Sequence, residues 1–283
     1  MIIDLQEKVL SNQIKIAYQD EGDKKKPILL FIHGLANYHG VWHWNIEMLK
    51  NNYRCIAIDL PGNGHSSRGF KQYSMDFYAE CVMLFIEEMK LKNVSLVGHS
   101  MGGMIAIKIV LAEKIKIEKL ILFAPAGFEY YSPHESMLFR SAISFGNFLN
   151  LDEVQIDQSV RTSFYKQNAI TEKIIKDLKN IIQHNDRTQY RKMLEQNINS
   201  MLDDDIFHQL KKIQIPTLVF FGENDMLIPN RFLHPQSTKE IAKKACKEIS
   251  DVQLFTYPNT GHFVQIEKAK EVCEEIEIFL KSF

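Results

Sequence analysis

The sequence predicts an α/β protein in which a mostly parallel central sheet is flanked by helices. Short segments rich in Val, Ile, Leu or Phe, each ending at Gly, Pro, Asp or Asn, alternate with longer segments of helical periodicity. The alternation stops once, between about residues 128 and 212, where only helix-like patterns occur before the strands resume. We therefore expect a single domain over residues 1–283, with a helical cap insertion at about 128–212 over one end of the sheet.

The expected elements follow from these periodicities in chain order. Two strands, Asp4–Leu10 and Ile14–Asp20, open the chain. Uniformly apolar runs are typical of fully buried parallel strands, and six are present: Ile28–Ile32, Cys55–Ile58, Val94–Val97, Leu120–Phe123, Thr217–Phe221 and Val252–Tyr257. Helices are expected over Met75–Met89, Met101–Ala112, Thr238–Ile249 and Ala269–Leu280.

The composition restricts the class of protein. Apolar residues make up 45% of the 283 residues and the formal net charge is −1, so a large core can form and nothing favours a nucleic-acid partner. The first residues are too polar for a signal peptide, and no apolar run reaches the ~18 residues of a membrane span. The four cysteines lie far apart, without metal-site or redox spacing. We expect a cytoplasmic protein with reduced cysteines.

The strongest chemical signal is the pentad Gly98-His99-Ser100-Met101-Gly102. An apolar strand runs directly into it and a helical pattern runs directly out of it, as a strained strand-to-helix turn requires. Gly98 and Gly102 are small enough for the backbone to double back, and the turn places the Ser100 hydroxyl at the positive end of a helix. The sequence therefore predicts Ser100 as a nucleophile.

A serine nucleophile needs a base, and the base needs an orienting acid. Asp225 follows the expected strand Thr217–Phe221, and His262 follows the expected strand Val252–Tyr257. The carboxyl ends of parallel strands meet at one sheet edge, so both side chains are expected near Ser100. Glu129, which follows the preceding strand, is an alternative acid for the same histidine.

The segment Leu30–Leu35 supplies a further element, because its strand ends in His33-Gly34. Such an ending can turn the next backbone N–H toward the nucleophile. We expect the amides of Leu35 and Met101 to form an oxyanion hole, which stabilises charge developing on a carbonyl oxygen. His33 could be a second base, but its expected role is to shape this loop together with Gly34.

Taken together, these residues resemble the α/β-hydrolase superfamily, in particular its small capped members, from about Pro27 to the C-terminus. Besides the pentad, the resemblance includes Gly222–Asp225, which we call the acid loop, and Gly261-His262, which we call the histidine loop. It also includes the turn Asp59-Leu60-Pro61-Gly62-Asn63-Gly64-His65-Ser66. In the family that turn is architectural, which implies that Asp59 and His65 are not catalytic. The resemblance implies an α/β-hydrolase fold and the catalytic residues Ser100, Asp225 and His262.

The same resemblance separates subclasses. Haloalkane dehalogenases and epoxide hydrolases carry an aspartate where this chain has Ser100. C–C bond hydrolases usually have a tryptophan after the catalytic histidine, where this chain has Phe263. The stretch Leu227–Ser237 is longer than the common form of this loop. The expected activity is that of a carboxylesterase on a small-molecule ester or related acyl substrate.

Several alternatives share this scaffold: thioesterase, acylglycerol lipase, aminopeptidase and C–C hydrolase activity, or ligand binding without catalysis. No cofactor and no metal is expected, because the chain has no clustered metal ligands and no phosphate-binding fingerprint. Aromatic and aliphatic residues of the insertion favour an apolar acyl or aryl pocket, although most of them could pack the insertion onto the sheet; they are Phe128, Tyr130, Tyr131, Met137, Leu138, Phe139, Phe145 and Phe148.

Overall fold

A computed structural model describes residues 5–145, 152–183 and 186–282. Its eight strands form one sheet in the order β1-β2-β4-β3-β5-β6-β7-β8. The strands are β1 (Gln6–Val9), β2 (Lys15–Glu21), β3 (Ile28–Ile32), β4 (Arg54–Ile58), β5 (Val94–His99), β6 (Leu120–Phe123), β7 (Thr217–Gly222) and β8 (Val252–Tyr257). The fold class predicted from the sequence is confirmed: β1, β2 and β4 pair antiparallel and all other neighbours pair parallel.

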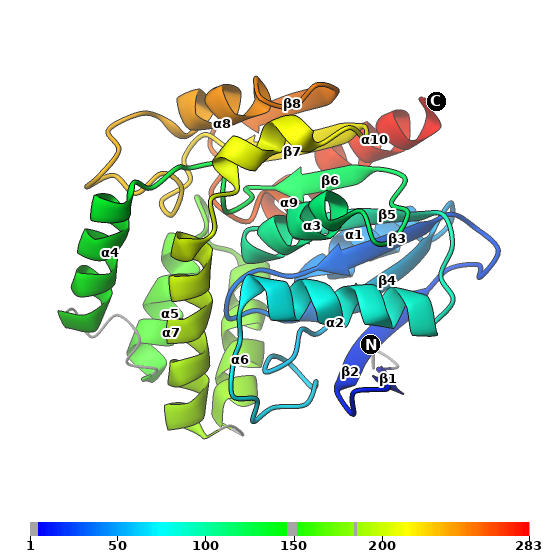
Figure 1. The fold of residues 1–283 in the computed structure, drawn as a ribbon, viewed down its shortest axis with the longest axis horizontal. Coiled ribbons are helices and arrows are strands. Elements are labelled where there is room, and N and C mark those ends of the chain that lie inside the picture. Colours follow the sequence, from blue (N-terminus) through cyan, green and yellow to red (C-terminus); the bar gives the residue numbers. More distant parts are fainter. Residues whose placement is uncertain (1–4, 146–151, 184–185, 283) are drawn as a thin grey trace.

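Helices cover both faces of this sheet. Figure 1 shows α2 and α3 in front of the sheet, with α1 and α10 behind it. Outside the segment between β6 and β7, the helices are α1 (His43–Leu49), α2 (Met75–Glu88), α3 (Met101–Ala112), α8 (Thr238–Cys246), α9 (Val264–Glu267) and α10 (Ala269–Lys281). Strands β3, β4, β5, β6 and β7 are buried almost throughout because helices exclude water from both of their faces.

Among the described residues between β6 and β7 there are four α-helices, which we call the insertion helices. They are α4 (Pro133–Phe145), α5 (Glu153–Thr162), α6 (Ala169–Gln183) and α7 (Arg187–Asp203). Figure 1 shows them beside the sheet edge toward which the parallel strands point. The 3₁₀ turn η2 (Phe207–Lys212) follows them and leads into β7.

The structure corrects two expectations. The sequence predicts a fully buried β8, but its residues are only partly buried, and Gln253 is exposed, because β8 is the last strand of the sheet. The sequence does not predict the 3₁₀ turn η1 (His39–Trp42) or helix α1. Neither has a capping hydrogen bond from a side chain, and buried Trp42, Ile46 and Leu49 show that tertiary packing stabilises them.

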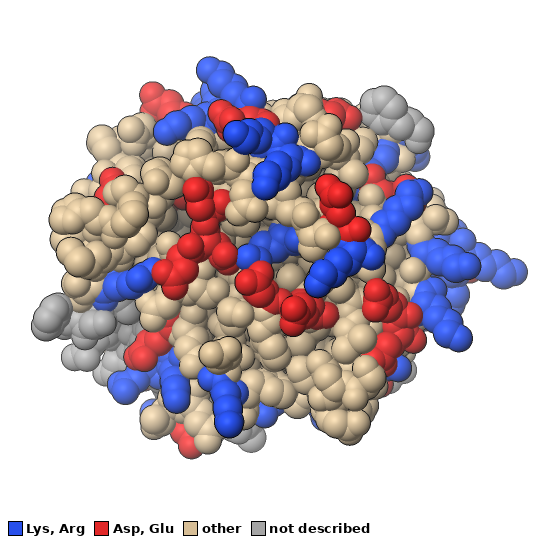
Figure 2. All heavy atoms as spheres, viewed as in Figure 1, with Lys and Arg blue, Asp and Glu red and all other residues tan. Residues whose placement is uncertain are grey.

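The surface and the cysteines complete this description. Figure 2 shows acidic and basic side chains interspersed on one face. No helix in the described ranges is long and apolar enough to cross a membrane. The four cysteines, expected to be reduced packing residues, are free and buried.

Candidate active site

Ser100 lies at the turn between β5 and α3, in a backbone conformation that side chains rarely adopt. Its φ is 54° and its ψ is −118°. A Cβ built at Gly98 would lie 2.5 Å from the Gly102 oxygen, and one built at Gly102 would lie 2.3 Å from the Ile32 oxygen. Glycine is therefore needed on both sides of Ser100 so that the strained turn can pack against β3.

His262 and Asp225 meet at the same edge of the sheet, as their positions after β8 and β7 predict. The Asp225 Oδ2 atom is 2.7 Å from His262 Nδ1. The other carboxylate oxygen accepts backbone N–H bonds from Leu227 (2.7 Å) and Ile228 (3.1 Å). Both side chains are almost completely buried. The carboxylate can therefore fix the ring orientation of the histidine and stabilise it when charged.

The Ser100 hydroxyl makes no hydrogen bond to any described residue, so it is available to a ligand. Ser100 and His262 both line one cavity of about 690 Å³. This volume is within the range of small-molecule sites. Apolar residues supply most of the lining, and the insertion helices contribute Ile156, Val160, Leu178, Ile182, Leu194 and Ile198 among others.

Only some of the aromatic and aliphatic residues that the sequence suggests for the pocket line the cavity. Tyr130, Tyr131 and Phe139 line the cavity. Phe128 is buried. Met137 and Leu138 are exposed by 56% and 45%. The Phe145 side chain and Phe148 lie outside the described residues. The pocket therefore depends more on helices α5, α6 and α7 than the sequence suggested.

Leu35 and Met101 lie where two backbone N–H groups are free. Met101 is the first residue of α3, so its N–H has no acceptor within the helix. Neither this N–H nor that of Leu35 donates to a described residue. The Asn37 side chain donates to the Leu35 carbonyl (3.0 Å) and holds the loop in place. Leu35 lines the cavity that Ser100 also lines, and Met101 directly follows Ser100.

His33 is a buried, neutral histidine that holds the loop after β3. Its Nδ1 is 2.7 Å from the Gly34 oxygen, and its Nε2 accepts the Leu60 N–H at 3.0 Å. Burial lowers the pKa of His33 to about 4. A ring that accepts a hydrogen bond on Nε2 must be neutral there, which agrees with this low pKa.

The low pKa of His33 predicts acid sensitivity. In the unfolded chain the ring binds a proton near pH 6.5, whereas in the folded protein it does so only near pH 4. Stability should therefore fall as the pH decreases from about 6.5 to 4, by about 3 kcal/mol from His33 alone. Calorimetry at pH 7.5, 6, 5 and 4.5 would measure the decrease. His33→Gln should flatten it, and His65→Gln, at an exposed histidine, should not. An NMR titration showing that His33 gains its charge near pH 6.5 contradicts the prediction.

His99, inside the pentad, is a site residue that sequence reasoning missed. Its ring centroid is 4.7 Å from that of His262, and its Nε2 is 3.1 Å from the His262 carbonyl oxygen. Burial and the neighbouring His262 lower the pKa of His99 well below its usual value, so the ring is neutral. The only sequence feature that could have indicated the contact of His99 with His262 is the position of His99 directly before Ser100.

Glu267 also joins the histidine loop to the insertion helices, and no sequence pattern indicates it. Its Oε1 accepts the Gly261 N–H at 2.7 Å, and its Oε2 accepts the N–H groups of Tyr165 (3.0 Å) and Lys166 (3.3 Å). Burial raises the pKa of this carboxyl. The residue before His262 is thus tied to the segment that follows α5.

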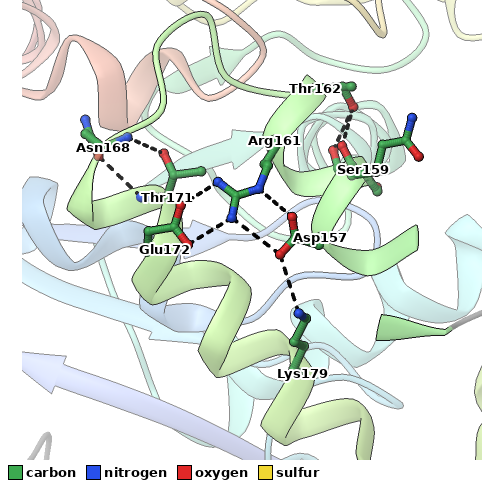
Figure 3. Close-up of polar contacts among 9 residues, drawn as sticks. Asp157, Ser159, Arg161, Thr162, Asn168, Thr171, Glu172 and Lys179 are labelled. Atoms are coloured by element: carbon green, nitrogen blue, oxygen red, sulfur yellow. Dashed lines mark hydrogen bonds and ion pairs between the residues drawn. The ribbon is translucent and has the colours of Figure 1, made fainter. Parts of the chain in front are cut away.

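The end of α5 contacts His262 directly. The His262 N–H donates to the Ser163 carbonyl at 2.8 Å. Figure 3 shows how α5 is held against α6: Arg161 bridges Asp157 and Glu172, and Lys179 contacts Asp157 at 3.4 Å. Exposed ion pairs of this kind contribute little to stability because water screens them.

Glu129, the alternative acid, is engaged elsewhere. Its Oε1 is 2.5 Å from His234 Nδ1 and accepts the Asn230 N–H at 2.8 Å. Within the described residues, no hydrogen bond joins it to His262. The geometry thus brings Asp225, rather than Glu129, to His262.

The Asp59 turn is compact and buried. Asp59 accepts the N–H groups of His39 (2.6 Å) and His65 (2.8 Å). Burial alone would raise the pKa of Asp59, but the adjacent His39 holds it below its usual value. No group of three or more His, Cys, Asp or Glu suited to a metal ion is found among the described residues.

Comparison with known proteins identifies the family. The model of the "alpha/beta hydrolase fold" family matches residues 27–269. The uncharacterized hydrolase YugF of Bacillus subtilis is 25% identical, over 95% of both chains. Human monoacylglycerol lipase ABHD6 is 23% identical, over 91% of this chain and 76% of its own.

Solved structures agree on the fold. The esterase EaEST from Exiguobacterium antarcticum superposes with a TM-score of 0.82 at 20% identity, covering 98% of this chain and 99% of its own. At this identity the likeness shows the fold alone. The family match extends from β3 to the start of α10 and includes every candidate catalytic residue. The chain therefore belongs to the alpha/beta hydrolase fold family.

Proposed function

We propose that this hydrolase cleaves carboxylic ester or thioester bonds of small to medium apolar substrates through an acyl-enzyme. Ser100 is the nucleophile, His262 the general base and Asp225 the orienting acid. The observation that carries the proposal is the 2.7 Å contact of Asp225 with His262 in the apolar cavity that Ser100 lines. Residues 1–283 act as one domain, and the insertion helices form a cap over that cavity.

In the first step, Ser100 Oγ attacks the substrate carbonyl carbon, and His262 Nε2 takes the proton of the Ser100 hydroxyl. The carbonyl oxygen becomes an anion, which the N–H groups of Leu35 and Met101 bind. The bond to the leaving alcohol or thiol then breaks, His262 returns the proton to it, and an acyl group remains on Ser100. Water, deprotonated by the same histidine, attacks this ester and releases the acid.

The position of the hydroxyl supports these roles. Ser100 Oγ has no competing partner among the described residues, and the contact with Asp225 occupies His262 Nδ1. His262 Nε2 is therefore the nitrogen left to act on Ser100. No hydrogen bond joins these two atoms within the described residues, and such bonds often form only when substrate is bound.

The cavity lining supports an acyl group as the main binding determinant. Each methylene group of the acyl chain that leaves water contributes about 0.8 kcal/mol to binding. If the transition state gains this energy, kcat/KM rises about fourfold for each methylene. We expect kcat/KM for p-nitrophenyl esters to rise from acetate to at least hexanoate and to level off when the chain fills the cavity.

The test is steady-state hydrolysis of p-nitrophenyl esters from acetate to decanoate, together with fluorophosphonate labelling read out by peptide mass spectrometry. Turnover with label on Ser100 supports the proposal. A matched monoacylglycerol series asks whether glycerol esters, the substrates named for the 23% identical lipase, are used here. Labelling without turnover on any ester points to amide or C–C substrates. The absence of both labelling and turnover points to a ligand-binding protein.

A further inference from the structure

The loop between β7 and α8 places His234 between two carboxylates. Its Nδ1 is 2.5 Å from Glu129 Oε1, and its Nε2 is 3.3 Å from Glu135 Oε1. The side chains of His234 and Glu129 are only 15% and 4% exposed. Both ring nitrogens of a mostly buried histidine thus face acceptors, an arrangement that a neutral ring satisfies only in part.

The backbone of this loop is shaped to support that contact. The N–H groups of Leu233 and His234 both donate to the Asn230 carbonyl, at 3.1 and 2.8 Å, closing a single helical turn. At the start of the turn, the Asn230 N–H donates to Glu129 Oε1 at 2.8 Å. One carboxylate oxygen therefore receives both a backbone donor and the His234 ring from the same turn.

The other end of the loop is fixed to the catalytic acid. Asp225 Oδ1 accepts the N–H groups of Leu227 and Ile228. The Arg231 guanidinium donates to the Asp225 carbonyl at 3.3 Å and to the Thr238 hydroxyl at 3.2 Å. The loop is thus a short, internally bonded connection from Asp225 to His234.

At the His234 end, the loop contacts helix α4, which forms one wall of the cavity. Ser136, Phe139 and Arg140 of α4 line the cavity. Apart from Glu135, the polar contacts that attach α4 to other segments within the described residues are the Arg140–Asp203 ion pair (2.5 Å) and a 3.4 Å bond from Ser136 to the Leu202 carbonyl. In Figure 1, α4 stands apart from the sheet, with the loop between β7 and α8 at its upper end.

Acidic and polar groups surround the His234 ring. Glu129 and Tyr131 face it from the segment after β6, Glu135 faces it from α4, and the cation of its own loop, Arg231, is bound to backbone oxygens. Hydrogen bonds from Ser132 hold the pKa of Glu135 below its usual value. Burial and the neighbouring Glu129 raise the pKa of Tyr131, which stays neutral. An imidazolium donates to both carboxylates, whereas neutral imidazole has one N–H.

We propose that His234 is a positioning residue that ties α4 to the loop between β7 and α8 and thereby sets selectivity for long acyl chains. This inference rests on the proposed esterase function. Without the Glu135 carboxylate or the His234 ring, α4 loses this tie to the loop. The acyl wall then loosens, while Asp225 keeps its own contacts with His262 and with the N–H groups of Leu227 and Ile228.

The kinetic test compares the KM of p-nitrophenyl octanoate with that of p-nitrophenyl acetate in the wild type and in variants. Taking the ratio of the two KM values removes any effect of a substitution that both substrates share. In Glu135→Gln and His234→Gln the octanoate-to-acetate KM ratio should be about threefold to tenfold higher than in the wild type, the range expected for the loss of one hydrogen bond. His134→Gln, at the exposed histidine next to Glu135, is the matched control and should behave as wild type.

A second measurement does not depend on hydrolysis. The unfolding midpoints of wild type, Glu135→Gln, His234→Gln and the double variant should show coupling between the two positions. Glu135 is more exposed than His234, so Glu135→Gln tests the bridge even where His234→Gln does not fold. Additive effects on the midpoints, or a KM ratio in Glu135→Gln equal to that of the wild type, overturn the inference. If the wild type hydrolyses no ester, the proposed function fails and the thermal cycle still tests the bridge.

Discussion

Replacing Ser100 with Ala is expected to lower kcat for p-nitrophenyl esters about 10⁶-fold, leaving only the residual rate that substrate binding and the oxyanion hole provide. The reason is that alanine has no hydroxyl to attack the carbonyl held between His262 and the Leu35 amide. The unfolding midpoint should stay nearly the same. The hydroxyl makes no hydrogen bond to a described residue, and Ala keeps the Cβ, so the strain at φ 54° is unchanged.

Initial rates with the best ester of the series, together with calorimetry, check both halves of this prediction. Ser141→Ala, at an exposed serine of α4 outside the cavity, is the matched control and should retain wild-type turnover. A Ser100→Ala protein that keeps more than about a hundredth of the wild-type kcat would remove Ser100 as the nucleophile.

Replacing Asp225 with Asn is expected to lower kcat about 10⁴-fold. The amide keeps the size of the side chain but carries no charge to stabilise the imidazolium. The Asn side chain can also donate a hydrogen bond, whereas the carboxylate only accepts. It therefore no longer selects the productive tautomer of His262. Because two backbone N–H groups converge on the position of Oδ1, the amide nitrogen of the substituted side chain must face His262 Nδ1.

The pH dependence of kcat should be measured alongside its value. The lost rate should be recovered in part at high pH, where the imidazolium need not be stabilised. Glu223→Gln is the control on the same loop, because this carboxylate contacts Lys239 and Thr256 instead of the site. Near wild-type turnover in Asp225→Asn would return Glu129 to consideration as the acid.

The pentad around Ser100 was predictable from the sequence because its constraints are local. A buried strand, two obligatory glycines and a following helix occupy consecutive residues, and each leaves its own signal. The positions of Asp225 and His262 were predictable for a related reason. In a parallel sheet, residues that follow strands meet at one edge whatever the distance between them in the chain.

The contacts of Glu129 and Glu267 were not predictable. Glu129 follows a strand just as Asp225 does, so sequence position alone left both as acids for His262. Only the packing of the loop between β7 and α8 brings His234 to Glu129. Glu267 lies in a short helix without a motif, and its partners include backbone N–H groups 102 and 101 residues away in the chain.

The sequence by itself determined the alternation of strands and helices, the strained turn at Ser100 and the order of the candidate catalytic residues. These features depend on periodicity and on neighbouring residues. The tertiary structure decided which acid reaches His262, which insertion residues line the cavity, and how His234 joins α4 to the loop between β7 and α8. Those contacts join residues whose spacing along the chain carries no periodic signal, so only the packing of the helices against the sheet defines them.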